Sequence, residues 1–84
     1  MQIEQRRLAD LKDAQHNSRT HSVQQIDQIA ASMEEFGWTN PILIDEHDEI
    51  IAGHGRKAAG LQRGEEYGPC VVLAGLTDTQ KRAY

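Results

Sequence analysis

A chain of 84 residues holds one domain at most, and 38% hydrophobic with 26% charged residues is typical of a folded globular domain rather than a disordered segment. The formal net charge is −4, from nine Lys and Arg against thirteen Asp and Glu, which excludes nucleic-acid binding through bulk charge and leaves only a local patch. The one cysteine excludes an internal disulfide and fits a reducing, cytoplasmic setting, and no apolar run approaches the ~20 residues of a membrane span. We therefore expect a single cytoplasmic domain without membrane contact.

The first half of the chain predicts a short strand followed by an amphipathic helix. Residues 3–11 alternate weakly between apolar and polar types, as a short strand does. Ser22 and Gln25 match a capping box, in which the hydroxyl accepts a hydrogen bond from an amide of the first helical turn. Apolar residues then recur every three or four positions, which predicts a helix over 23–36 that ends at Gly37.

The second half predicts a hairpin, a helix, a strand and a final helix. The polar run Asp45–Glu49 separates two apolar segments, and we expect it to be a solvated hairpin tip rather than a metal site. The expected elements after the first helix are paired strands over 42–44 and 50–52, a helix over 56–63, an interior strand over 70–74, and a helix from Thr77 or Asp78 to the chain end. A turn over 12–17 precedes the first helix. This order predicts a small mixed sheet with helices packed over it, and the last helix suggests a fragment of a longer protein.

The segment IIAGHGRKAAG, residues 50–60, carries the clearest chemical signal. A strand that turns directly into a helix leaves backbone amides at the helix start, and these amides with the helix dipole favour an anion. Gly53 and Gly55 let the backbone approach a ligand closely, and Arg56 would oppose the dipole unless an anion lay between them. Phosphate fits best, because a guanidinium and backbone amides can share its oxygens. A plain tight turn with solvated Arg56 and Lys57 stays open as the alternative.

The four histidines and the tryptophan are further candidates for site residues. None of the histidines has the spacing of a zinc site, so we expect no metal to be bound by them. His54 differs because it lies within the turn, where it can contact a phosphate oxygen or act as a general acid. Trp38 follows the end of the first helix, and we expect it at the edge of the core rather than as a base-stacking platform.

Four segments together resemble the N-terminal domain of ParB partition proteins. They are NSRTH, QIDQIAASMEEFGWTNPILID, EIIAGHGRKAA and LTDTQKRAY, and their order and spacing carry the resemblance over roughly residues 4–84. Within that group the chain is most similar to a branch of phage and mobile-element proteins that are often fused to DNA methyltransferases. The wider superfamily includes sulfiredoxin and a free-serine kinase. The resemblance implies one domain over 1–84 with a ParB N-terminal/sulfiredoxin-like fold.

The resemblance also implies a nucleotide site. In the family the strand–Gly–Arg–helix turn binds phosphate, and in partition ParB it reads Gly-Glu-Arg-Arg and grips cytidine triphosphate. Here the outer glycine and arginine are kept, while histidine and glycine replace the two inner residues. The arginine of NSRTH matches a second nucleotide-contacting arginine, and Asn-Pro resembles a Gln-Pro that approaches from the other side. The residues expected to bind nucleotide and phosphate are Gly53, His54, Gly55, Arg56, Lys57, Arg19 and Asn40, with CTP or ATP as ligand and Mg²⁺ as its companion.

Three functions stay open at this stage. The first is a nucleotide-binding module of a DNA-associated protein, in chromosome or plasmid partition or in a phage-type DNA methyltransferase, whose full-length form contacts DNA and self-associates. The second is a nuclease or phosphotransferase, with Asp45 and Glu49 as the only acids near the turn in sequence. The third is a docking module for a fused methyltransferase, with an exposed apolar strip on helix 23–36.

The departures from the family pattern limit the chemistry that the resemblance implies. Sulfiredoxin carries its catalytic cysteine at the place of His54, so reductase chemistry is not implied. The family's metal-binding Glu-Asn segment lies in a later helix that these 84 residues do not include, and the DNA-reading helix-turn-helix is also absent from them. The resemblance therefore implies weak nucleotide binding and at most weak nucleotide hydrolysis.

Overall fold

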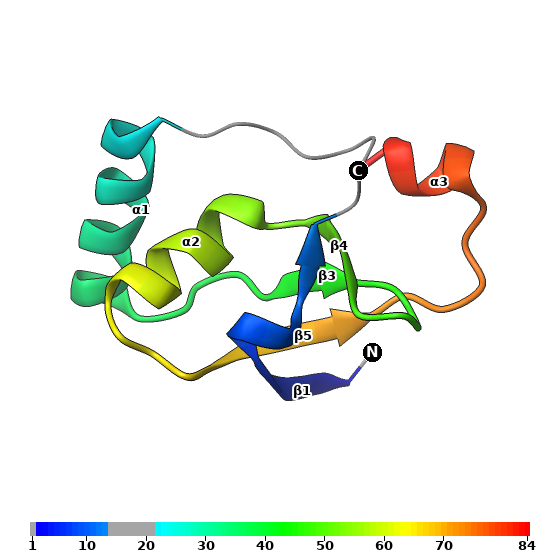
Figure 1. Ribbon diagram of the computed structural model, residues 1–84, viewed down its shortest axis with the longest axis horizontal. Helices are drawn as coiled ribbons and strands as arrows, with labels where there is room; N and C mark the ends of the chain where they lie inside the picture. Colours follow the sequence, from blue (N-terminus) through cyan, green and yellow to red (C-terminus); the bar gives the residue numbers. More distant parts are fainter. Residues whose placement is uncertain (1, 14–21) are drawn as a thin grey trace.

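The computed structural model describes residues 2–13 and 22–84, in which five strands form one mixed sheet (Figure 1). The elements in chain order are β1 (Ile3–Arg7), the 3-10 helix η1 (Leu8–Asp10), β2 (Lys12–Asp13), α1 (Val23–Phe36), β3 (Ile42–Ile44), β4 (Glu49–Ala52), α2 (His54–Gln62), β5 (Tyr67–Val72) and α3 (Asp78–Arg82). The strand order across the sheet is β1-β5-β3-β4-β2. The predicted mixed α/β architecture is confirmed.

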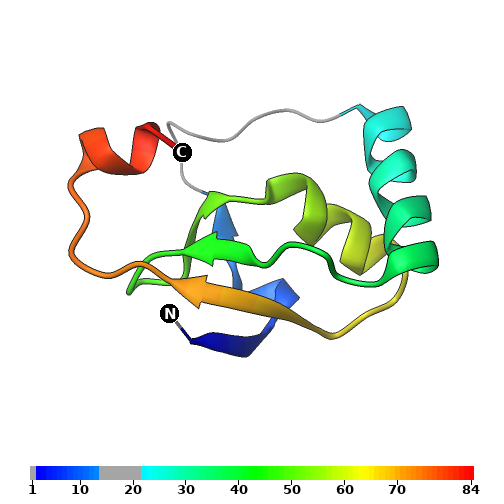
Figure 2. The same ribbon diagram turned by 180° about the vertical axis from the view of Figure 1, so that it is seen from behind.

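Strand β5 is interior, as predicted, but it begins three residues earlier than expected. It pairs with β1 in antiparallel fashion and with β3 in parallel, and Figure 2 shows it between these two strands. The pairing with β3 starts only at Cys70, which faces Ile42, whereas Pro69 faces Gln5 of β1. Proline lacks an N–H for a sheet ladder, so Pro69 within a strand needs an explanation. It is tolerated here because this part of β5 has a neighbour on one side only.

The short strand β2 was not predicted, since residues 12–13 were expected to lie in a turn. Its two residues pair in parallel with Glu49 and Ile50 of β4. The backbone N–H of Lys12 also donates to the carbonyl of Asp48 at 2.9 Å. Two residues are too few to display the alternation that marks a strand in sequence. The hairpin of β3 and β4 itself is confirmed, with Leu43 opposite Ala52.

In the described residues, α1 begins with the capping box predicted at Ser22, and α3 begins with a second capping box at Thr77, one of the two residues expected to cap it. The hydroxyl of Ser22 accepts from the N–H of Gln25 at 3.1 Å, and the hydroxyl of Thr77 accepts from the N–H of Gln80 at 3.1 Å. Helix α1 has its predicted bounds and ends at Gly37, while α3 ends two residues before the expected end. No helix in residues 2–13 and 22–84 is long and apolar enough to cross a bilayer.

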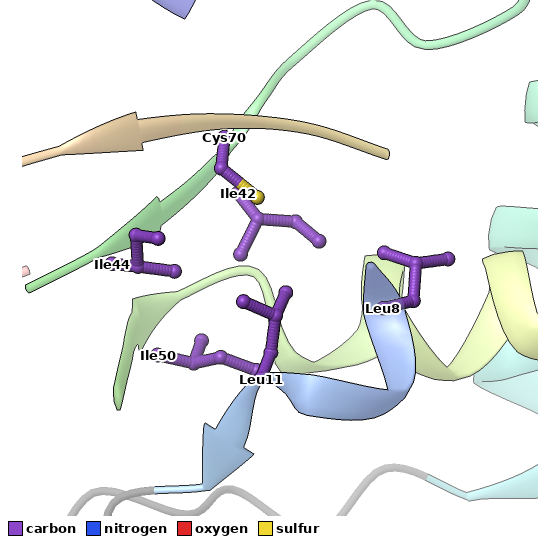
Figure 3. Packing of buried hydrophobic residues seen from close by; sticks show 6 residues of the cluster. All are labelled: Leu8, Leu11, Ile42, Ile44, Ile50 and Cys70. Carbon is purple, nitrogen blue, oxygen red and sulfur yellow. The ribbon is translucent and has the colours of Figure 1, made fainter. Parts of the chain in front are cut away.

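The hydrophobic core consists of two clusters joined by one indole. The first lies between the sheet and the segment around η1 and contains Leu8, Leu11, Ile42, Ile44, Ile50 and Cys70 (Figure 3). The second lies between α1 and α2 and contains Ala30, Met33 and Ala59. Trp38 is half-buried and packs against both clusters, so it lies further into the core than the edge position predicted for it. The free thiol of Cys70 is buried, and burial raises its pKa.

Some of the apolar side chains that recur at helical spacing along α1 lie outside the core. Ala30 and Met33 are buried, but the side chains at the two ends of the helix, Val23 and Phe36, are 75% and 67% exposed. The apolar periodicity predicted the helix correctly, but only side chains from its middle turns are buried in the core. The expectation of some exposed apolar surface on this helix is therefore met at its two ends.

The turn between β3 and β4 is solvated at Glu46 and His47, as the sequence predicted, but its first residue, Asp45, is buried. Asp45 is only 1% exposed, and its Oδ1 accepts from the N–H groups of His47 and Glu49 at 2.8 and 3.0 Å. Its Oδ2 accepts from Lys81 Nζ of α3 at 2.8 Å. Burial alone would raise the pKa of Asp45, but these donors outweigh it and lower that pKa below its usual value. The same hydrogen bond raises the pKa of the Lys81 ammonium.

Replacing Asp45 by Asn should therefore change how the free energy of unfolding depends on pH. A carboxyl group whose pKa is lowered by folding stabilises the native state above its unfolded pKa, and this contribution is lost as the pH falls through the folded pKa. We expect Asp45→Asn to be less stable than the native chain at pH 7, with the difference shrinking below about pH 4. Urea titrations at a series of pH values measure this, with the exposed Asp10→Asn as control. Parallel pH profiles for the native chain and Asp45→Asn would contradict it.

Candidate functional site

The turn from β4 into α2 requires a glycine at position 53. Gly53 has a φ of 105°, in the left-handed region, and serves as the N-terminal cap of α2. A Cβ at this position would lie 3.3 Å from the Cα of Ile42, tighter than side chains normally pack. The carbonyl of Gly53 accepts the first intrahelical bond, from the N–H of Lys57 at 3.1 Å. This geometry starts α2 at His54, two residues before the predicted start at Arg56.

The start of α2 lacks the side-chain cap that the other two α-helices have. Within residues 2–13 and 22–84, no side chain hydrogen-bonds at its cap position, whereas α1 and α3 each carry a capping box. The first amides of an α-helix have no partner within the helix and point along its axis. Gly55 is buried in this first turn and His54 is half-buried. Backbone N–H groups at a helix start favour an anion, so the anion site that the sequence predicts here stays a prediction.

The guanidinium of Arg56 folds back over this turn. Its Nη1 lies 3.4 Å from the position that a Cβ on Gly53 would occupy, and the residue is half-buried. Most other basic side chains are held by acids, for example Arg7 by Glu66 at 2.6 Å. Among residues 2–13 and 22–84, no ion pair includes Arg56. Its positive charge is thus not neutralised by a carboxylate of this part of the chain.

Arg56 lines a cavity of about 280 Å³ between α1, the segment after it and the start of α2. The cavity is lined by Gln28, Ile29, Ser32, Met33, Trp38, Thr39, Asn40 and Arg56. One wall is apolar and the rest is built of hydroxyl and amide groups, with Arg56 the only charged residue in the described lining. The structure therefore brings Asn40 and Arg56, which were predicted separately, to the same cavity. Such a cavity suits a ligand with an apolar, planar part and an anionic part.

Of the predicted site residues, only Asn40 and Arg56 are in the described lining of this cavity, while Gly53, His54 and Gly55 form the turn into α2. Lys57 points to the N-terminal segment instead, where its Nζ donates to the carbonyl of Leu11 at 2.8 Å and lies 4.0 Å from Asp13 Oδ1. Its contact with a phosphate stays a prediction that would require this hydrogen bond to break. Arg19 lies outside the described residues.

The walls of the cavity are the part of the site that sequence reasoning missed. Gln28, Ile29, Ser32 and Met33 come from one face of α1, and Trp38 comes from the segment that follows it. A signal was present, because residues spaced one, three and four apart on a helix share a face and this face carries both polar and apolar types. The apolar periodicity assigns Ile29 and Met33 to the core-facing stripe and Gln28 to another face, so it does not mark these residues as one cavity wall.

Comparison with known proteins places the chain in a family. The ParB N-terminal domain model matches residues 1–84. The chain belongs to the ParB N-terminal domain family. It is 50% identical over 82 residues to the ParB-like nuclease domain-containing protein YnaK of Escherichia coli K12, covering 98% of this chain and 94% of that protein. The predicted resemblance is thereby confirmed at the level of the family.

Solved structures confirm the fold. The chain matches a C-terminally truncated chromosome-partitioning protein ParB from Caulobacter crescentus, complexed with CTP-gamma-S, with a TM-score of 0.82 and 22% identity. The match covers 96% of this chain but 48% of that one, so the chain spans about half of the ParB structure. Sulfiredoxin from Arabidopsis thaliana matches with a TM-score of 0.78 and 20% identity over 94% of this chain and 92% of that one. At these identities the two matches establish the shared architecture.

Substituting Gly53 by Ala should destabilise the chain more than the same change at Gly64. Both glycines have positive φ, where a Cβ costs about 1–2 kcal/mol, but only Gly53 has another backbone within 4 Å. We expect Gly64→Ala to show the conformational cost alone, and Gly53→Ala to lose about 1 kcal/mol more from crowding against Ile42. Urea denaturation of the two variants measures the difference. Equal losses would mean that the turn relaxes away from β3.

Proposed function

We propose that this chain is a nucleotide-binding module, with the phosphates of a nucleoside triphosphate against the start of α2 and Arg56. The observation that carries this proposal is that a helix start without a side-chain cap and an arginine without an ion pair in the described chain lie together beside one cavity. Membership of the ParB N-terminal domain family supports it, as does the likeness to a ParB that was complexed with CTP-gamma-S.

The electrostatics of the site favour a bound anion over the bare turn. A guanidinium near the positive end of a helix dipole is unfavourable, and the net charge of −4 provides no general attraction for phosphate. A phosphate between the N–H groups and Arg56 would satisfy both with charge-assisted hydrogen bonds. The proposed ligand residues at this point are Gly53, His54, Gly55 and Arg56, and Lys57 and Arg19 are proposed only as approaching it.

The remainder of the nucleotide would occupy the cavity beside this turn. Asn40 and Gln28 supply amide groups at its rim, and Ile29 and Trp38 supply apolar surface for a base or sugar. We propose CTP or ATP with Mg²⁺ as the ligand. We propose that the module acts in the cytoplasm, in partition or with a phage-type DNA methyltransferase, in contact with DNA and with self-association in response to the nucleotide.

Isothermal titration of the full-length protein with CTP, ATP and GTP in the presence of Mg²⁺ tests this proposal. We expect Arg56→Ala to weaken the bound nucleotide by about 10- to 100-fold, because charge-assisted hydrogen bonds contribute about 1.5–3 kcal/mol. Arg82→Ala removes the same charge from α3, at the opposite end of the molecule from α1 (Figure 1), and should leave the affinity within about twofold. Absence of heat with all three nucleotides would overturn the proposal.

A nuclease or phosphotransferase is the second candidate, favoured by the name of the relative at 50% identity. Metal-assisted hydrolysis needs clustered carboxylate or histidine ligands, and residues 2–13 and 22–84 contain no group of three His, Cys, Asp or Glu placed to hold an ion. Asp45 is already held by Lys81. Incubating supercoiled plasmid with the protein and Mg²⁺ separates the two candidates. Cleavage that disappears in Arg56→Ala would favour the enzyme, and an intact plasmid would favour the binding module.

A further inference from the structure

Trp38 lines the cavity. Its indole is linked by polar contacts to Glu65 and, through it, to Arg63, and neither of these residues lines the cavity. The indole Nε1 donates to both carboxylate oxygens of Glu65, at 3.3 and 3.4 Å. Glu65 Oε2 lies 3.6 Å from Arg63 Nε, and Arg63 Nη1 donates to the carbonyl of Ala30 in α1 at 3.3 Å. A polar chain therefore runs from the indole to Glu65, then to Arg63, and ends on the backbone of the helix that forms the facing wall.

The benzene edge of the Trp38 ring packs closely against the backbone of two glycines, Gly60 and Gly68. A Cβ on Gly60 or on Gly68 would lie 3.1 Å from the six-membered ring of Trp38, and 2.7 or 2.8 Å from the side chain of Leu8. The ring is thus held at its benzene edge by shape and at its pyrrole edge by the carboxylate. With only two side-chain torsions and both edges fixed, the indole presents one face to the cavity.

We propose that Glu65 and Arg63 are positioning residues for the ligand cavity. They fix the plane of the indole and tie the segment around Trp38 to α1 at Ala30, so that together they set the width of the cavity. Neither residue would touch the ligand, since neither lines the cavity. The part of this inference that concerns affinity rests on the proposed nucleotide function, and the part that concerns the ring does not.

The indole N–H provides a direct readout, because Trp38 is the only tryptophan and yields a single indole cross-peak in a ¹H–¹⁵N spectrum. Glu65→Met keeps the size of the side chain and removes the acceptor, whereas Glu65→Gln keeps a carbonyl acceptor. We expect the indole proton to shift upfield and exchange about threefold to tenfold faster in Glu65→Met, and to stay near its native position in Glu65→Gln. Glu66→Met, one residue along the chain at an exposed position, is the matched control and should leave the cross-peak unchanged.

Nucleotide titration then tests the effect on the cavity. We expect Glu65→Met and Arg63→Met to raise the dissociation constant about threefold to tenfold, and Glu65→Gln and Glu66→Met to change it by less than twofold. A native-like cross-peak in Glu65→Met would overturn the proposal, and so would a shifted cross-peak with unchanged affinity. If the native protein binds none of the nucleotides, the proposed function fails, and the cross-peak alone decides whether Glu65 positions the ring. If Glu65→Met does not fold, the dissociation constants of Arg63→Met and Glu65→Gln are compared instead.

Discussion

The passage of the chain from β4 into α2 directly over β3 is the constraint on which the site depends. Ile42 is fully buried in β3, and a Cβ at Gly53 would lie only 3.3 Å from its Cα, which is tight even for alanine. A positive φ at this point turns the chain into a helix that runs toward α1 (Figure 1). The helix start and Arg56 lie within one turn of this close approach, and Arg56 reaches the cavity against α1 from there.

The two core clusters show how a chain of this size stabilises a sheet and a helical pair at once. An 84-residue domain buries a modest share of its surface, so a large side chain that serves two clusters contributes more than one that serves a single cluster. Trp38 does this by packing against both the sheet cluster and the α1–α2 cluster. Trp38 also lines the cavity, so both the stability of the core and the shape of the site depend on the position of its ring.

The features that the sequence predicted are those that local chemistry determines. The bounds of α1, the capping boxes at Ser22 and Thr77, and the hairpin all follow from residues within a few positions of one another. The features that it missed depend on partners far along the chain. Asp45 is buried because Lys81 reaches it from 36 residues away, and Lys57 turns from the site because Leu11, 46 residues away, offers it a carbonyl. No local pattern marks such partners.

The pairing of β1 with β5 has a consequence for how the chain is made. Within the described residues β1 pairs with β5 alone, so its partner lies almost at the other end of the domain, with Arg7 opposite Tyr67. At ribosomal rates of about 5–20 residues per second, roughly 3 to 12 seconds separate the synthesis of these two positions. During translation the nascent strand is unpaired for this time. Four of the five side chains in its sequence, Ile-Glu-Gln-Arg-Arg, are polar and hydrated, and they discourage contact with neighbouring nascent chains.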